Sequence, residues 1–228
     1  MPLKKLIQTC KKNFFIIILG FFSFFINYHY GFIGVMPLDN FVLYNGGYKV
    51  LNGFVPFNDY WLVTGAILDY LNAFFFLLNG VTWKSYIIHS SIFNLIITLL
   101  TYILFINLGL SKKLAFFYSL LFSILFYPVV GTPFVDHHST FFSLISVYFF
   151  IFAIIKNNKN YFFYIPLFFI LSFLSKQTPF AYIFISLFTL ISLYFFYTKE
   201  KKKTFLIFLK GSIFALVLTA VFFLCYKN

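Results

Sequence analysis

Residues 11–34 read KKNFFIIILGFFSFFINYHYGFIG. Lysines precede an apolar stretch from Asn13 to about Phe32, and about 20 such residues are enough to cross the hydrocarbon core of a bilayer. A basic start before an apolar run is also typical of a secretory signal peptide, but no small-x-small cleavage site follows here. We therefore interpret this stretch as a retained first membrane span.

The composition of the whole chain favours the same class. Of its 228 residues 62% are hydrophobic and 26% aromatic, which leaves too little polar surface for a soluble domain. The net charge of +12 comes from lysines in short clusters between apolar runs, and this is not the pattern of a nucleic-acid-binding face. The chain has no arginine, so Lys, backbone N–H groups or neutral donors must make any contact with phosphate. Cys10 and Cys225 lie near opposite ends of the chain and are not expected to pair.

Apolar runs bounded by Lys, Asn or Gly predict seven membrane spans. These cover about residues 13–34, 86–109, 114–131, 138–155, 161–175, 179–197 and 204–225. The stretch from Leu62 to Val81 is long enough for an eighth, but a crossing there would move the later lysines to the other side. We therefore expect an all-α integral membrane protein with about seven transmembrane helices, forming a single module over residues 1–228, with a large first extracytoplasmic loop at 35–84.

In this topology the lysines and the carboxylates fall on opposite sides of the membrane. Twelve lysines are cytoplasmic if the N-terminus is cytoplasmic, as the positive-inside rule predicts. They are Lys4, Lys5, Lys11, Lys12, Lys112, Lys113, Lys156, Lys159, Lys199, Lys201, Lys202 and Lys203. Four of the five carboxylates, those of Asp39, Asp59, Asp69 and Asp136, fall on the outer side. Ionisable groups are costly at membrane depth, so this grouping predicts a functional site on the outer face.

The high content of Phe, Lys, Ile and Asn is typical of an AT-rich bacterial genome, which suggests a bacterial inner (plasma) membrane.

The first outer loop is expected to contain two interfacial helices. We predict that Asp39 caps the first helix and that Gly46–Gly47 ends it. The second should run from Gly65 to Leu78 and end at Asn79–Gly80. For Asp39 a capping role and a role as a general base are compatible, because one carboxylate oxygen can cap while the other accepts a proton.

Three other acidic positions have ordinary structural interpretations. Asp59 suits a turn or a helix cap, with Tyr60 beside it as an interface anchor. Asp69 and Asn72 share a helix face, and we favour the polar side of an interfacial helix for both. Asp136-His137-His138 invites a metal site, but consecutive helical side chains point about 100° apart and rarely chelate together. We therefore interpret Asp136 as an N-cap and expect no cofactor, with a divalent metal as the less favoured alternative.

Lys176-Gln177 follows an unusually short span. From Tyr161 to Ser175 an α-helix rises only about 22 Å, less than the ~30 Å hydrocarbon core, so Lys176 should lie below the outer interface. A lysine that extends to the interface is the common interpretation. The alternative is a cation in a recessed cavity, suited to a lipid phosphate.

The stretch from Leu38 to Gly80 resembles the first outer loop of GT-C type, polyprenyl-phosphate-dependent glycosyltransferases, such as protein O-mannosyltransferases and lipid A aminoarabinose transferases. Those loops carry an acidic residue, a short helix, Gly-x-x-Pro-aromatic-x-Asp, and then Gly-Pro-Leu before an aromatic-rich helix. The matching residues here are Asp39, Gly53, Pro56, Phe57, Asp59 and Gly65, with Ala66-Ile67 in place of Pro-Leu. Asp136 resembles a second acidic position, and Lys176-Gln177 a Lys-Gln pair, of the same family.

The resemblance implies that Asp39 deprotonates an acceptor hydroxyl, to which a sugar is transferred from a polyprenyl-phosphate donor. Lys176, with Lys84, would stabilise the leaving phosphate, and Asp136 or His137 would orient the donor or acceptor. Substrate contacts are also expected from Asp59, Tyr60 and Gln177. Family members add further spans to a seven-span N-terminal module, so we expect this chain to correspond to that module without the C-terminal part.

Two other functions remain open at this point. A lipid flippase or transporter would bury polar residues within spans or break its helices, and Lys210 and Pro166 are the candidates for such features. A non-catalytic membrane subunit of a transferase complex is the second. The expected partners are a polyprenyl-phosphate-linked sugar, a lipid or glycan acceptor and membrane lipids, but no nucleic acid. The transferase hypothesis predicts that Asp39, Asp136 and Lys176 meet at one outward-facing cavity.

Overall fold

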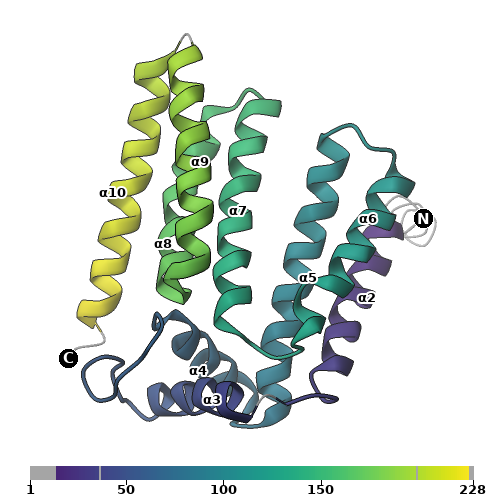
Figure 1. The fold of residues 1–228 in the computed structure, drawn as a ribbon, viewed down its shortest axis with the longest axis vertical. Helices are drawn as coiled ribbons and strands as arrows, with labels where there is room; N and C mark the ends of the chain where they lie inside the picture. Colours follow the sequence, from purple (N-terminus) through teal and green to yellow (C-terminus); the bar gives the residue numbers. More distant parts are fainter. Residues whose placement is uncertain (1–13, 36, 199, 226–228) are drawn as a thin grey trace, which may run out of the picture. The chain divides into compact units, whose positions relative to one another are not determined.

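The structure is a computed structural model that describes residues 14–35, 37–198 and 200–225. Figure 1 shows that this part of the chain is built from helices. In chain order they are α2 (Phe14–Tyr30), α3 (Pro37–Leu51), α4 (Ile67–Asn79), α5 (Trp83–Asn107), α6 (Lys112–Leu125), η1 (Tyr127–Val129), α7 (Val135–Ile155), η2 (Lys159–Phe163), α8 (Ile165–Ser175), α9 (Gln177–Tyr197) and α10 (Lys201–Cys225). Within these residues no strand forms, and the all-α class is confirmed.

Several of these helices are long and apolar enough to cross a membrane. Among the described residues five meet this criterion of length and composition: Trp83–Asn107, Lys112–Val129, Val135–Ile155, Gln177–Tyr197 and Lys201–Leu224. Three shorter apolar segments are Phe14–Tyr30, Ile67–Asn79 and Lys159–Ser175. Ile67–Asn79 has 13 residues and rises about 20 Å, well short of a hydrocarbon core. The count of seven spans stays a prediction.

The chain divides into two compact units, which we describe separately. The first comprises Met1–Asn40 with Val81–Pro133, and the second comprises Phe41–Gly80 with Phe134–Asn228. Cys10 and the four most N-terminal lysines lie outside the described residues. The predictions of unpaired cysteines and of a cytoplasmic N-terminus therefore stay predictions.

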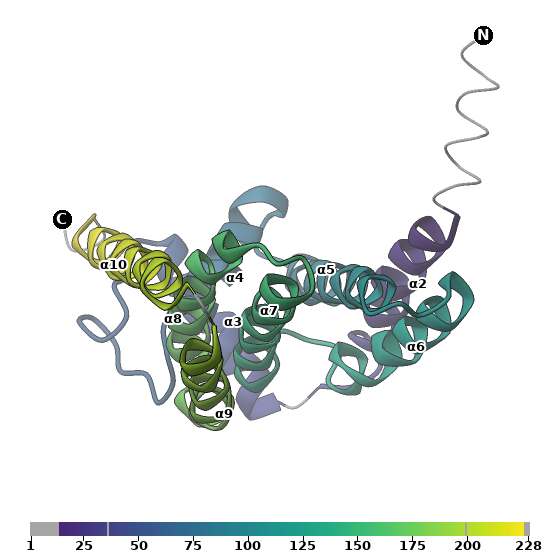
Figure 2. The same ribbon diagram turned by 90° about the horizontal axis from the view of Figure 1, so that it is seen from above.

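In the first unit, α2, α5 and α6 pack against one another, as the end-on view in Figure 2 also shows. Fully buried asparagines join them. Asn27 Nδ2 donates to Ser90 Oγ at 2.9 Å and to the Gly131 carbonyl at 3.2 Å, and Asn94 Nδ2 donates to the Ser23 carbonyl at 2.8 Å. Small and polar side chains of this kind hold helices together in a bilayer, where burial of apolar surface gives no advantage over lipid contact.

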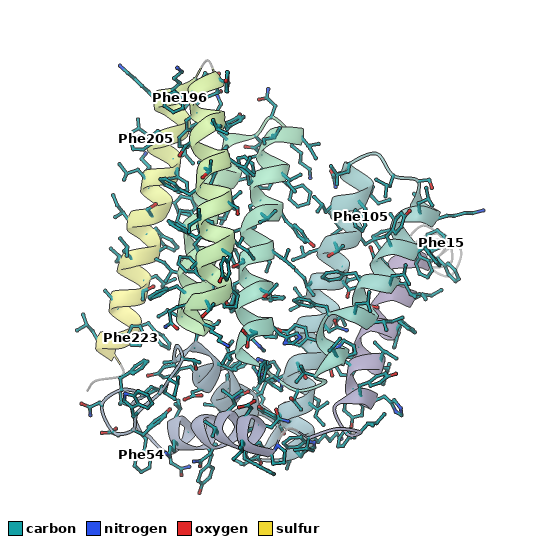
Figure 3. All side chains as sticks on the ribbon, in the orientation of Figure 1. Phe15, Phe54, Phe105, Phe196, Phe205 and Phe223 are labelled. Carbon is teal, nitrogen blue, oxygen red and sulfur yellow. The ribbon has the colours of Figure 1, made fainter. Side chains whose placement is uncertain are left out.

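In the second unit, hydroxyl groups join α7 to α8. Ser172 Oγ lies 3.0 Å from Ser139 Oγ and 2.7 Å from Ser143 Oγ, and all three serines are fully buried. Toward the other end of this unit the contacts are aromatic: Phe195 meets Phe205 edge-on with ring centres 6.2 Å apart, and Figure 3 labels Phe205 where α9 passes to α10. The serine cluster therefore fixes α7 and α8 near one end, just before Lys176.

The predicted end of the first loop helix at Gly46–Gly47 is wrong, because α3 continues to Leu51. A Cβ added at Gly46 would meet the Asp69 carboxylate, and one at Gly47 would meet the Asn72 side chain. The two glycines thus let α3 lie directly on α4, and their role is close packing rather than helix termination. The second helix predicted for this segment is α4, which begins at Ile67 rather than Gly65 and ends, as predicted, before Gly80 at φ +79°.

The lysine clusters of the second unit gather at one end. Lys159, at the start of η2, forms an ion pair with Glu200, which lies in the connection between α9 and α10. Figure 1 shows the α7–α8 and α9–α10 connections at the same end of this unit. This is the arrangement predicted for two loops on the lysine-rich side of a membrane.

Candidate functional site

Asp39 is the third residue of α3, and its side chain is exposed. With Val35, Pro37 and Leu38 it lines an open hollow of about 400 Å3 in the first unit. The N-cap interpretation is wrong, because the helix begins at Pro37 and Asp39 lies within its first turn. A carboxylate there still interacts favourably with the positive end of the helix dipole. The surrounding residues leave this carboxylate open to a ligand from water.

The residue after Asp39 is held firmly. Asn40 is fully buried, and Thr132 Oγ1 donates to its Oδ1 at 2.9 Å. The Tyr86 hydroxyl lies 3.4 Å from the Asn40 carbonyl oxygen and 3.1 Å from that of Pro133. Sequence reasoning missed these contacts, because their partners are 46 and 92 residues away. No motif in the sequence links them.

In the second unit, Lys176 and Asp136 form an ion pair. Lys176 Nζ donates to Asp136 Oδ2 at 2.8 Å, and the two side chains are 31% and 38% exposed. Lys176 has an extended backbone between α8 and α9, and Ser139 Oγ donates to its carbonyl oxygen at 2.9 Å. The N-cap interpretation of Asp136 is wrong, because Phe134 occupies that position and Asp136 is the second residue of α7. Its carboxylate is therefore free to bind the lysine.

The segment just before α4 lies against the same helix end. The Gly65 N–H donates to the Ser175 carbonyl at 3.2 Å, and a Cβ at Gly65 would meet the Leu174 carbonyl oxygen. Glycine is required at this position because only a residue without a side chain permits such an approach. Gln177, the first residue of α9, is exposed just beyond Lys176.

Asp59 closes a turn, as its structural interpretation predicts. Its Oδ2 accepts a hydrogen bond from the Val55 N–H at 2.7 Å, and its Oδ1 accepts one from Asn58 Nδ2 at 2.8 Å. The side chain is exposed, but these local bonds use both oxygens. A role in binding substrate stays a prediction for Asp59.

Half-buried Tyr60 forms a hydrogen bond with buried Asp69 that sequence reasoning did not predict. The Tyr60 hydroxyl donates to Asp69 Oδ2 at 2.7 Å, and Lys49 Nζ lies 4.6 Å from the centre of the Tyr60 ring. Asp69 is only 2% exposed, and this burial raises its pKa to about 6, although the Tyr60 hydrogen bond and the Lys49 charge act in the opposite direction. Burial and the Asp69 carboxylate both raise the pKa of Tyr60.

Asp69 and Asn72, interpreted from the sequence as the polar side of an interfacial helix, are thus not on an exposed face of α4. Asn72 is also fully buried, and its Nδ2 donates to the Leu43 carbonyl of α3 at 3.1 Å. α3 covers both side chains because Gly46 and Gly47 allow it to approach.

The histidines beside Asp136 both contact Phe134, His137 through its ring and His138 through the backbone. The His137 ring meets Phe134 edge-on at 6.0 Å, and His138 Nδ1 lies 3.1 Å from the Phe134 carbonyl oxygen. Within the described ranges no three His, Cys, Asp or Glu side chains gather in a way that could hold a metal ion. The expectation of no metal stays a prediction.

Lys84 is exposed in the first turn of α5, in the same unit as Asp39, and its role stays a prediction too.

The structure thus brings Asp136 to Lys176 and Tyr60 to Asp69. Asp39 belongs to the other unit, so its meeting with Lys176 stays a prediction. No protein-family model matches the chain, and neither a curated protein nor a solved structure is significantly similar to it.

Proposed function

We propose that this chain is a membrane glycosyltransferase, or the catalytic module of one, that transfers a sugar from a polyprenyl-phosphate donor to an acceptor hydroxyl. The observation that carries the proposal is the exposed carboxylate of Asp39, which lies in an open hollow. Asp39 belongs to α3, and α3 follows the apolar helix α2 in the chain. A base in that place can meet an acceptor from water while the tail of a lipid donor stays in the bilayer.

The chemistry needs two groups that the chain supplies. Asp39 takes the proton of the acceptor hydroxyl, whose oxygen attacks the anomeric carbon of the sugar. The bond from that carbon to the phosphate oxygen breaks, and the lipid phosphate leaves with the electron pair. A cation stabilises the charge that develops on this phosphate. Lys176 is proposed for this role, with Lys84 as a second cation.

Asp136 is proposed to hold Lys176 ready for the phosphate. The ion pair is partly exposed, so an incoming phosphate can reach the ammonium group. A phosphate then shares Lys176 with the carboxylate or displaces it, and Asp136 keeps the ammonium group in place between turnovers.

Pro166 and Lys210, the two residues singled out from the sequence as candidates for a transporter, have local explanations. Pro166 lies in the first turn of α8, where its missing N–H breaks no helical hydrogen bond. The Lys210 side chain is exposed on α10 rather than buried among helices. The proposal places the chain in a bacterial plasma membrane, with a cytoplasmic N-terminus and the site on the outer face.

The test is to purify the protein from membranes and identify bound lipids by mass spectrometry. A panel of labelled polyprenyl-phosphate hexoses and pentoses is then supplied in proteoliposomes, and released polyprenyl phosphate is measured. We expect a polyprenyl-phosphate species in the purified protein and release from at least one donor. Lipid translocation without release would identify a flippase, and copurification with a larger transferase in which Asp39 is dispensable would identify a non-catalytic subunit. Either result contradicts the proposal.

A further inference from the structure

Asn40 follows Asp39 directly in α3, but the two side chains have opposite environments. Asp39 is exposed in the hollow, whereas Asn40 is fully buried. Thr132 donates to the Asn40 carboxamide oxygen at 2.9 Å, and the Tyr86 hydroxyl lies 3.4 Å from its backbone carbonyl oxygen. Two segments of the first unit, far apart in sequence, therefore hold the first turn of α3.

This arrangement is not one that stability alone would favour. Among the described residues Asn40 Nδ2 has no hydrogen-bond partner, although it is buried. A buried amide donor without a partner costs free energy, and a leucine of similar size at this position would avoid that cost. The carboxamide oxygen, in contrast, has a well-placed donor in Thr132. What Asn40 provides, and a leucine would not, is therefore a hydrogen bond that fixes the start of α3 to Thr132.

We propose that Asn40 is a positioning residue for Asp39. Thr132 and Tyr86 hold Asn40, and Asn40 fixes the backbone of the turn that carries the Asp39 carboxylate. This inference rests on the proposed function, in which Asp39 is the general base. A base acts only within hydrogen-bond reach of the proton it removes, and a misplacement of about 1 Å can lower the rate about 100-fold.

Substitution of Thr132 separates positioning from general stability. Thr132→Val removes the donor to Asn40 and keeps the side-chain shape, whereas Thr132→Ser keeps the hydroxyl. Thr101→Val is the matched control, because the buried Thr101 hydroxyl donates to the Ile97 carbonyl within α5, in the same unit. The assay is release of polyprenyl phosphate from the active donor of the panel described above.

Thr132→Val is expected to lower kcat about 10- to 100-fold, with KM for the donor within about twofold of the wild type. Thr132→Ser keeps the hydroxyl and should have the kcat of the wild type, and Thr101→Val should leave kcat unchanged. Amide hydrogen exchange in residues 37–44 should be faster in Thr132→Val than in the wild type. If Thr132→Val does not purify as a monodisperse protein, Tyr86→Phe replaces it with the same expectations.

Failure of this inference can be distinguished from failure of the proposed function. Full kcat in Thr132→Val, with Asp39→Asn inactive, rejects the positioning role and leaves the function intact. An equal loss of kcat in Thr101→Val, or unchanged exchange in residues 37–44, also rejects it. Wild-type activity in Asp39→Asn rejects the proposed function itself.

Discussion

The ammonium group of Lys176 lies 2.8 Å from the carboxylate of Asp136, although 40 residues separate them in the sequence. The pair joins the end of α8 to the start of α7 in the second unit. Because both side chains are about one-third exposed, water screens their attraction, and the pair contributes little to stability. We therefore attribute the ion pair to the proposed role of Lys176 in binding a lipid phosphate.

Lys176→Gln should therefore affect binding far more than folding. We expect the free energy of unfolding to change by about 1 kcal/mol or less, as for other partly exposed ion pairs. Affinity for polyprenyl phosphate should fall, because a cation that faces the phosphate is lost. Asp136→Asn should instead raise this affinity, since no carboxylate then competes for the ammonium group. Native mass spectrometry with polyprenyl phosphate measures both variants, and weaker binding by Asp136→Asn would show that Asp136 does not compete.

The buried carboxylate of Asp69 predicts a dependence of stability on pH. Its pKa is raised from 3.8 to about 6, so the folded state binds the proton more tightly than the unfolded state. The protonated Asp69 carboxyl should therefore contribute about 3 kcal/mol to the stability of the second unit below about pH 4, and this contribution should be lost as the pH rises through 6. Asp69→Asn should remove this loss, because Asn keeps an acceptor for the Tyr60 hydroxyl and carries no charge.

Unfolding followed by tryptophan fluorescence between pH 4 and 8 measures this effect. Trp61 lies beside Tyr60 in the chain and reports on this region. Tyr60→Phe should move the loss to a higher pH, because the Tyr60 hydrogen bond favours the charged form of Asp69. A difference in the free energy of unfolding between the wild type and Asp69→Asn that stays constant from pH 4 to pH 8 would contradict the buried position of Asp69.

The close approach of α3 to α4 predicts a large difference between two glycine substitutions. Gly46→Ala places a methyl group against the Asp69 carboxylate, and such overpacking costs about 1–3 kcal/mol. Gly20→Ala, inside α2, meets no atom within 4 Å and should be neutral or stabilise the helix by up to about 1 kcal/mol. Thermal unfolding in detergent compares the two variants. Equal effects would mean that α3 does not lie on α4 at Gly46.

Patterns that depend on neighbouring residues were predictable from the sequence. Apolar run lengths predicted the helices, and lysine clusters predicted that the connections near Lys159 and Glu200 share one end of the second unit, where these residues form an ion pair. Asn79–Gly80 marked the end of α4 correctly, because a glycine at positive φ follows the helix.

Contacts between distant segments were not predictable in the same way. Gly46–Gly47 has the local pattern of a helix end, and only the presence of α4 makes it a packing surface. Asp69 has the pattern of an exposed polar face, and the same packing buries it. The link from Thr132 to Asn40 spans 92 residues and has no local pattern at all.

The most direct test of the proposed function is the reaction of Asp39→Asn. Release of polyprenyl phosphate from the labelled donor is measured in proteoliposomes for the wild type, Asp39→Asn and Glu200→Gln. Glu200 serves as the control carboxylate, because it pairs with Lys159 at the lysine-rich end of the second unit. We predict that Asp39→Asn abolishes release at unchanged protein level, while Glu200→Gln retains it. Release by Asp39→Asn at the wild-type rate would contradict the assignment of Asp39 as the base.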